Sequence, residues 1–208
     1  DTLSYARADN AINKCKDIPA AEQLLKLYTK SGNRIGMMLV YKVLGKKYRE
    51  SNQFFDAIRI HRKGLEIAQE LADTLEIIRA LNNLGTNHRR IGVLDEAAFF
   101  HYQALLYCNL YSQKDRKIKK SRVISLNGIG NVMLTLNNYE VADSVFRIAL
   151  IGEKELGSDL GQAINYANIG AIFEAKGKND SAMVYYTQSL EYNIRAKSDL
   201  GIALCYIS

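Results

Sequence analysis

Proline, tryptophan and cysteine are scarce in this chain. Its 208 residues include one proline, Pro19, no tryptophan and three cysteines. Because proline breaks helix interiors, a single proline over this length fits an all-α protein. Cys15, Cys108 and Cys205 stand far apart, have no CxxC spacing and are odd in number. We therefore expect free thiols, and neither a zinc site nor a disulfide framework.

Long apolar runs and a strong excess of one charge are also lacking. No stretch approaches the roughly 18 apolar residues of a membrane span, and no signal peptide is visible. The 28 Lys and Arg exceed the 22 Asp and Glu by six, which slightly favours acidic partners and falls short of a nucleic-acid-binding signature. The basic run 114–122 (KDRKIKKSR) is interpreted as a solvated segment between helices, with a contact to phosphate or an acidic partner as the alternative.

Catalytic and cofactor motifs are missing as well. The sequence has no GxxxxGK[ST], HExxH or GxSxG, and its acidic residues form no evident pair. His61, His88 and His101 fall at helical positions, where a packed histidine is favoured over a base or a metal ligand. We therefore expect a binding module that is not an enzyme and that needs no cofactor and no metal.

What the chain does have is a glycine that recurs in one register. Gly45, Gly85, Gly130 and Gly170 are separated by 40, 45 and 40 residues, and each follows Leu or Ile. An alanine stands twelve residues after each glycine, and a leucine stands eight residues after each alanine. The alanines are Ala57, Ala97, Ala142 and Ala182, and the leucines are Leu65, Leu105, Leu150 and Leu190. Residue types that recur at the same spacing in all four units indicate an internal repeat.

Each repeat is interpreted as two antiparallel helices. Turn residues at 51–53, 91–95, 136–139 and 176–180 separate the two helices of each pair. Glycine inside a helix costs about 1 kcal/mol relative to alanine. We expect packing to offset this cost, with Gly85 on the first helix and Ala97 on the second where the two axes approach closely.

Several helix starts are marked by capping residues. Asp73 with Glu76 fits a capping box, and Asp159 and Asp199 are expected to cap the helices that follow them. Asp17 and Pro19 predict the start of a helix near residue 18.

These repeats resemble the tetratricopeptide repeat (TPR) family over about residues 38–195. The resemblance rests on the Leu-Gly or Ile-Gly pairs, the aromatic residues near them and the alanine and leucine columns. The period of 40 to 45 exceeds the family's length of about 34, and the usual closing proline is missing. Both features resemble the long-repeat subgroup that includes kinesin light chains and bacterial peptide-sensing regulators. The resemblance implies an all-α protein whose antiparallel helix pairs stack as an α-α superhelix, or solenoid.

The repeats predict one solenoid over residues 1–208. It comprises a degenerate helix pair at 1–37, repeats at 38–77, 78–122, 123–162 and 163–198, and the start of a further repeat at 199–208. The final segment SDLGIALCYIS aligns with SDLGQAINYANIG, and the chain stops where the next Ile-Gly would come. We expect the protein to continue beyond Ser208, and we expect an apolar edge after Tyr192 through which this piece self-associates.

The resemblance also implies a binding surface, because the first helices of TPR pairs line a concave face. The predicted peptide-binding residues are Lys42, Lys46, Arg49, Arg79, Asn82, Asn83, Arg89, Asn127, Asn131 and Asn168. This surface is cationic toward its N-terminal half and amide-rich in the middle, and it becomes more apolar from Ile164 onward. An asparagine amide both donates and accepts, so it suits an extended peptide backbone. The alternative is that these asparagines are merely solvated.

Two functions remain open on this basis. The first is a protein- or peptide-binding region, with sensing or interaction as its role, of a larger bacterial signal-transduction or regulatory protein, with an acidic ligand favoured. The second is a constitutive assembly scaffold without switching. We expect no binding to nucleic acid or membrane by this region. The compartment stays open between the cytoplasm and an extracytoplasmic sensor region of a membrane-bound regulator.

Overall fold

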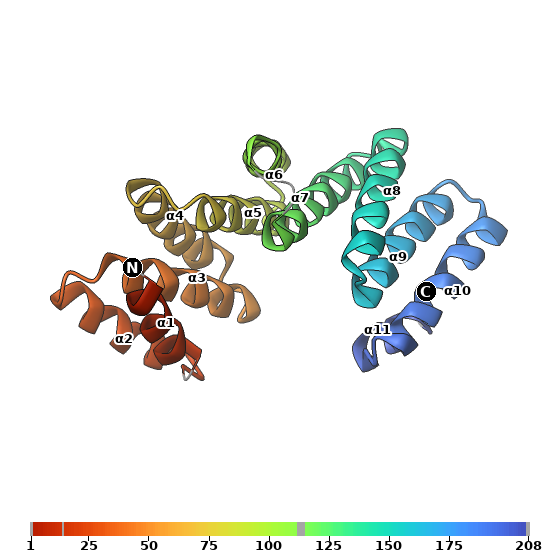
Figure 1. The fold of residues 1–208 in the computed structure, drawn as a ribbon. Coiled ribbons are helices and arrows are strands. Elements are labelled where there is room, and N and C mark those ends of the chain that lie inside the picture. The colour runs from red at the N-terminus through yellow and green to blue at the C-terminus, as the bar shows by residue number, and fades with distance from the viewer. Residues whose placement is uncertain (1, 14, 112–114, 207–208) are drawn as a thin grey trace. The chain divides into compact units, whose positions relative to one another are not determined.

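The computed structural model describes residues 2–13, 15–111 and 115–206 (Figure 1). All regular secondary structure within these ranges is helical, which confirms the predicted all-α class. The chain divides into two compact units, Asp1–Tyr107 and Cys108–Ser208, which are described separately.

The first unit is built from a succession of helices, and its first helix packs on its third. The helices are α1 (Thr2–Asn13), α2 (Ile18–Lys30), α3 (Arg34–Glu50), α4 (Phe54–Glu70), α5 (Thr74–Arg90) and most of α6 (Leu94–Leu110). Helix α3 packs on both α2 and α4, and α4 packs on α5. The predicted segment 1–37 contains two helices, α1 and α2, and both of them pack on α3.

The second unit continues the same pattern. Its helices are α7 (Arg116–Thr135), α8 (Tyr139–Leu156), α9 (Asp159–Ala175), α10 (Asn179–Arg195) and α11 (Asp199–Cys205). Each packs against the next one along the chain. The predicted turns are observed at 51–53, 91–93, 136–138 and 176–178. The predicted repeat starts at 38, 78, 123 and 163 lie inside the first helix of each pair. The reason is that the repeats were aligned on the recurring glycine, which lies within that helix and not at its start.

The predicted capping box and two predicted caps need correction. Asp73 does cap α5, since its Oδ1 accepts from the Glu76 N–H at 3.0 Å, but the Glu76 carboxylate pairs with side chains elsewhere. Ser158 and Ser198, rather than Asp159 and Asp199, are the capping residues of α9 and α11. Each aspartate is the first residue of its helix, where its charge favours the positive end of the helix dipole.

The other predicted helix start is correct, whereas the basic run was misassigned. Asp17 accepts from the Ala20 N–H at 2.8 Å, and α2 begins at Ile18. Residues 116–122 form the first two turns of α7 instead of a segment between helices, and Lys114 lies outside the described residues. Burial of Ile118 and Ser121 on one side of these turns is what makes the segment helical.

The recurring glycines lie where a ring of the partner helix crosses them. An added Cβ would lie 2.5 Å from the His61 ring at Gly45, 2.7 Å from the His101 ring at Gly85, 2.5 Å from Phe146 at Gly130 and 2.9 Å from Tyr186 at Gly170. The expected contact of Gly85 with Ala97 is therefore replaced by one with His101. The ring always stands sixteen residues after the glycine.

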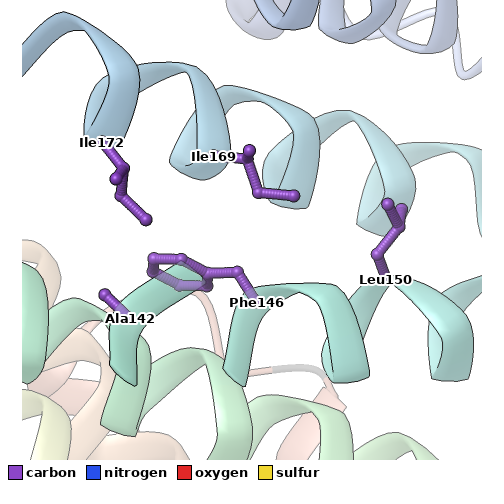
Figure 2. Packing of buried hydrophobic residues seen from close by; sticks show 5 residues of the cluster. All are labelled: Ala142, Phe146, Leu150, Ile169 and Ile172. Carbon is purple, nitrogen blue, oxygen red and sulfur yellow. The ribbon is translucent and has the colours of Figure 1, made fainter. Parts of the chain in front are cut away.

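The core of the second unit is built around one of these rings. Phe146 of α8 is fully buried and points toward Ile169 and Ile172 of α9, with Ala142 and Leu150 on its own helix beside it (Figure 2). A ring of this size fits between helices only because a glycine removes the Cβ from the opposing backbone. Glycine therefore recurs at these positions because a ring recurs sixteen residues later in each repeat.

Candidate functional site

In the first unit, a buried carboxylate gathers two of the predicted cations. Glu76, on the first turn of α5, is 3% exposed. Its Oε1 accepts from Lys42 Nζ at 3.0 Å and from Arg79 Nη1 at 2.5 Å, and the hydroxyl of Tyr5 donates to the same oxygen at 3.2 Å. Burial and the nearby Glu76 raise the pKa of Tyr5, which stays protonated. Lys42 and Arg79 therefore share one internal carboxylate, which offsets one of their two positive charges.

Arg49 and Arg89 form the cationic part of this surface. Arg49 Nη1 donates to Asn83 Oδ1 at 2.9 Å, so α3 and α5 are joined by a hydrogen bond between two predicted residues. Burial lowers the pKa of both arginines; the Glu50 carboxylate near Arg49 opposes this effect at Arg49, and Arg90 adds to it at both residues. Neither guanidinium makes an ion pair with a carboxylate in the described part of the chain. A half-buried guanidinium that makes no ion pair favours the binding of an anionic ligand.

Lys46 and Asn82 differ from their neighbours on the predicted surface. Lys46 is exposed and lies 3.5 Å from Glu50 on its own helix, a contact that contributes little in water. Asn82 is 5% exposed, and its Oδ1 lies 3.0 Å from Nδ1 of the buried His101. Asn82 therefore holds the α6 ring in place and is not presented on an open face.

In the second unit, three predicted asparagines lie on first helices of successive pairs. Asn127 and Asn131 belong to α7 and Asn168 to α9, and all three are half-buried. Oδ1 of Asn127 and Nδ2 of Asn168 are buried atoms without a hydrogen-bond partner. One is an acceptor and the other a donor, so together they match the N–H and C=O of an extended backbone. Leaving such atoms unpaired costs about 1–3 kcal/mol each.

A largely apolar pocket of about 360 Å³ lies between α9, α10 and α11. Its lining includes Ile164 and Ala167, where the predicted surface was expected to become apolar. The pocket is closed by apolar residues of α9 and α11 and by polar residues of α10. The residues are Leu160, Ala163, Leu200 and Leu204 on the apolar side and Tyr186, Ser189 and Asn193 on the polar side. Leu200, Leu204 and Tyr206 are strongly exposed, so the predicted apolar edge after Tyr192 is present.

The histidines are packing residues. His61 and His101 are fully buried against Gly45 and Gly85, and His88 lies against Phe100 with ring centroids 5.3 Å apart. Burial lowers the pKa of His61 to about 3 and that of His101 to about 4. These rings are therefore neutral at pH 7, and they serve the role that Phe146 and Tyr186 serve in the second unit.

Within the described ranges, no three His, Cys, Asp or Glu side chains gather closely enough to hold a metal ion. No described helix has the length and apolarity to cross a membrane.

Residues missed by sequence reasoning are mainly partners of the predicted ones. Glu76 was assigned to a capping box, yet it binds Lys42 and Arg79. The spacing of 34 residues from Lys42 to Glu76 gives no local signal, because it crosses a whole helix pair. Asn193, a pocket residue of α10, could not be found from the repeats, because the family pattern consists of apolar and glycine positions.

Comparisons with known proteins agree with this architecture. No family model and no curated protein sequence matches the chain. Among solved structures, aspartyl phosphate phosphatase F from Bacillus subtilis is similar with a TM-score of 0.80 and 17% identity, over 98% of this chain and 53% of that one. The Rap conjugation gene regulator of plasmid pLS20, in complex with the Phr* peptide, gives 0.76 and 20%, over 96% and 55%. BtubC (BKLC) from P. vanneervenii gives 0.72 and 18%, over 92% and 82%.

The fold is therefore that of the TPR-like repeat proteins, built from antiparallel helix pairs as expected. The likeness extends to Rap regulators, of which this chain spans about half the length. At these identities the similarity establishes the fold, and the function is argued from the site.

Proposed function

We propose that this chain is a non-catalytic peptide-binding repeat domain of a bacterial regulatory protein. Each unit offers its own surface to an extended ligand, on α3 and α5 in the first unit and on α7 and α9 in the second, and these helices carry the predicted residues. One observation carries the proposal: Asn127 and Asn168, on neighbouring first helices of the second unit, each keep one amide atom without a partner. Both atoms are covered in the unliganded chain, so the two half-buried side chains must turn outward for an extended backbone to supply the missing donor and acceptor.

Two further features support a peptide ligand. The pocket between α9, α10 and α11 has the size and apolar lining of a subsite for a ligand side chain. In the first unit, Arg49 and Arg89 supply positive charge without a carboxylate counter-ion among the described residues, which suits an acidic side chain or a terminal carboxylate. A solved structure of similar fold, the pLS20 regulator, contains a peptide.

The test is a peptide-library selection on the wild type and on an Asn127→Ala, Asn168→Ala double variant. We expect each lost amide to weaken binding by about 1–3 kcal/mol, since its backbone partner becomes unpaired. The matched control is Asn179→Ala, which removes an exposed asparagine of α10 and should leave affinity unchanged. Asn131→Ala, one turn after Asn127 on the same face of α7, reports whether the contact extends along α7.

Unchanged binding by the double variant would contradict the proposal. If the double variant selects the same peptides with the same affinity as the wild type, the amides are not ligand contacts. The constitutive scaffold function would then be favoured, with its contact surface outside these first helices.

A further inference from the structure

Helix α6 carries an apolar row on the side that faces solvent. Phe99, Tyr102 and Leu106 are 55%, 47% and 50% exposed. They follow at intervals of three and four residues, which places them on one face of the helix. Single exposed apolar residues need no explanation, whereas a row of large ones on one face marks an interaction surface.

The other second helices provide an internal control for this face. The repeat intervals place Arg59, Arg62 and Glu66 of α4, Ser144, Arg147 and Ile151 of α8, and Val184, Thr187 and Glu191 of α10 at the same positions. All nine of these side chains are exposed. Two of the nine are apolar, against three of three in α6. The fold therefore accepts polar residues at these positions, and packing within the chain does not account for the apolar row.

The charge pattern points to the kind of partner. Residues 97–111 contain no Asp, Glu, Lys or Arg, so the whole face is uncharged. It offers no counter-charge that would select a charged partner. A second copy of the same face approaches it without like-charge repulsion, which otherwise opposes the pairing of identical surfaces.

The spacing of the row is self-complementary. In a two-fold symmetric contact, residue i of one copy meets residue j of the other, and j meets i. Antiparallel pairing about an axis near Tyr102 brings Tyr102 to its own symmetry mate. The same axis brings Phe99 of each copy to within one residue of Leu106 of the other along the helices, since these residues stand three before and four after Tyr102.

We propose that this chain forms a two-fold symmetric dimer through antiparallel pairing of α6 with α6 of a second copy. This surface lies on α6, a second helix, whereas the peptide contacts proposed above lie on first helices. Three large side chains per copy make a small interface, and small interfaces are weak and transient. We therefore expect half-association at about 0.1–1 mM protein.

The first experiment measures association by sedimentation equilibrium up to about 2 mM, several-fold above the expected midpoint. The wild type should sediment as a monomer–dimer mixture. The triple variant F99R/Y102R/L106E, which installs the α4 residues of the same register, should associate at least ten-fold more weakly with unchanged helix content, and any association that it keeps belongs to the apolar edge near α11. Phe55→Ser removes a more exposed aromatic, 75% exposed on α4, and should associate like the wild type.

The second experiment tests the axis. In a Cys15→Ser, Cys205→Ser background, Tyr102→Cys should form an intermolecular disulfide on mild oxidation, because the two sulfurs meet across the two-fold. Arg62→Cys, the equivalent position of α4, should crosslink at least ten-fold more slowly. A monomeric wild type overturns the proposal. Undiminished association of the triple variant, or equal crosslinking at positions 62 and 102, overturns it as well and moves self-association to another surface.

Discussion

Cε1 of Phe146 would lie 2.5 Å from a Cβ at Gly130, so the ring of α8 occupies the space that any other residue of α7 would need. Gly130→Leu should lower the free energy of unfolding by about 1–3 kcal/mol through overpacking. That loss exceeds the gain of just under 1 kcal/mol in helix propensity. Urea unfolding followed by circular dichroism measures the difference.

The pairing of the two residues can be isolated by a double-variant cycle. Phe146→Ala alone should cost about 3–5 kcal/mol, because it empties the core. In the Gly130→Leu, Phe146→Ala double variant, the new leucine fills part of the vacated space, so the total loss should be smaller than the sum. Additive losses would show that Gly130 and Phe146 do not share this space.

Acid should destabilise the first unit through its buried histidines. His61 and His101 have folded-state pKa values near 3 and 4 because of burial, against about 6.5 when unfolded. The unfolded state therefore binds more protons below pH 6.5. Stability is intact above that pH and is lost progressively as the pH falls toward 4. At pH 5 the loss should approach 2 kcal/mol per histidine.

His61→Phe gives the matched control for this pH dependence. It installs the residue found at the equivalent Phe146, and it removes the His61 Nε2 that has no hydrogen-bond partner. The variant should fold, and its stability should fall less steeply between pH 7 and pH 5 than that of the wild type. The free energy of unfolding is measured with urea at both pH values. If it falls by the same amount in the variant and in the wild type, the acid sensitivity belongs to other groups.

Glu76 should contribute to the stability of the first unit as the partner of Lys42 and Arg79. Glu76→Gln keeps the shape and removes the charge, which leaves two cations without their counter-ion. Breaking a fully buried pair costs about 3–5 kcal/mol, but Lys42 and Arg79 are 30% and 37% exposed. Solvent screening should therefore reduce the loss to about 1–3 kcal/mol.

Glu66→Gln is the control for that change, because Glu66 is exposed on α4. Its effect on the melting temperature should be negligible. If the two variants melt alike, the Glu76 cluster does not contribute to folding.

The fold was largely readable from the sequence, because a repeat multiplies weak signals. One glycine in a helix says little, but four in one register identify the helix pairs and their turns. What the sequence did not show was the reason for the glycine. The ring sixteen residues later is His, His, Phe and Tyr in successive repeats, and this column is visible only if histidine is counted with the aromatic residues.

The candidate site was less predictable, because helical spacing gives the face of a residue but not its partner. Lys42, Asn82 and Asn127 share one repeat position, yet they have different surroundings. Lys42 meets Glu76, Asn82 is buried against His101, and Asn127 keeps an unpaired oxygen. Their surroundings differ because residues of other helices differ, and the sequence of the helix itself does not show which residues those are.

Helix ends offer a route to greater stability. Ala72 has φ 51° and Gly92 φ 81° at equivalent positions after α4 and α5. The left-handed region costs a residue with a Cβ about 1–2 kcal/mol and glycine little. Ala72→Gly should therefore raise stability by about 0.5–1 kcal/mol after the entropy of glycine is subtracted. Gly92→Ala should lower it, and a thermal melt showing the same sign for both would contradict this account.

Arg49 and Arg89 should bind the anionic part of a ligand, since both are half-buried without a carboxylate partner in the described part of the chain. Sulfate at constant ionic strength should raise the melting temperature of the wild type more than chloride does, and Arg89→Gln should reduce this difference. With an acidic peptide from the library, Arg89→Gln should weaken affinity by about 1–3 kcal/mol. Lys46→Gln, at an exposed site, should change mainly the association rate and its salt dependence. Equal effects of the two variants on affinity would mean that Arg89 acts only as diffuse surface charge, and the ligand anion would then have to be sought at another cation.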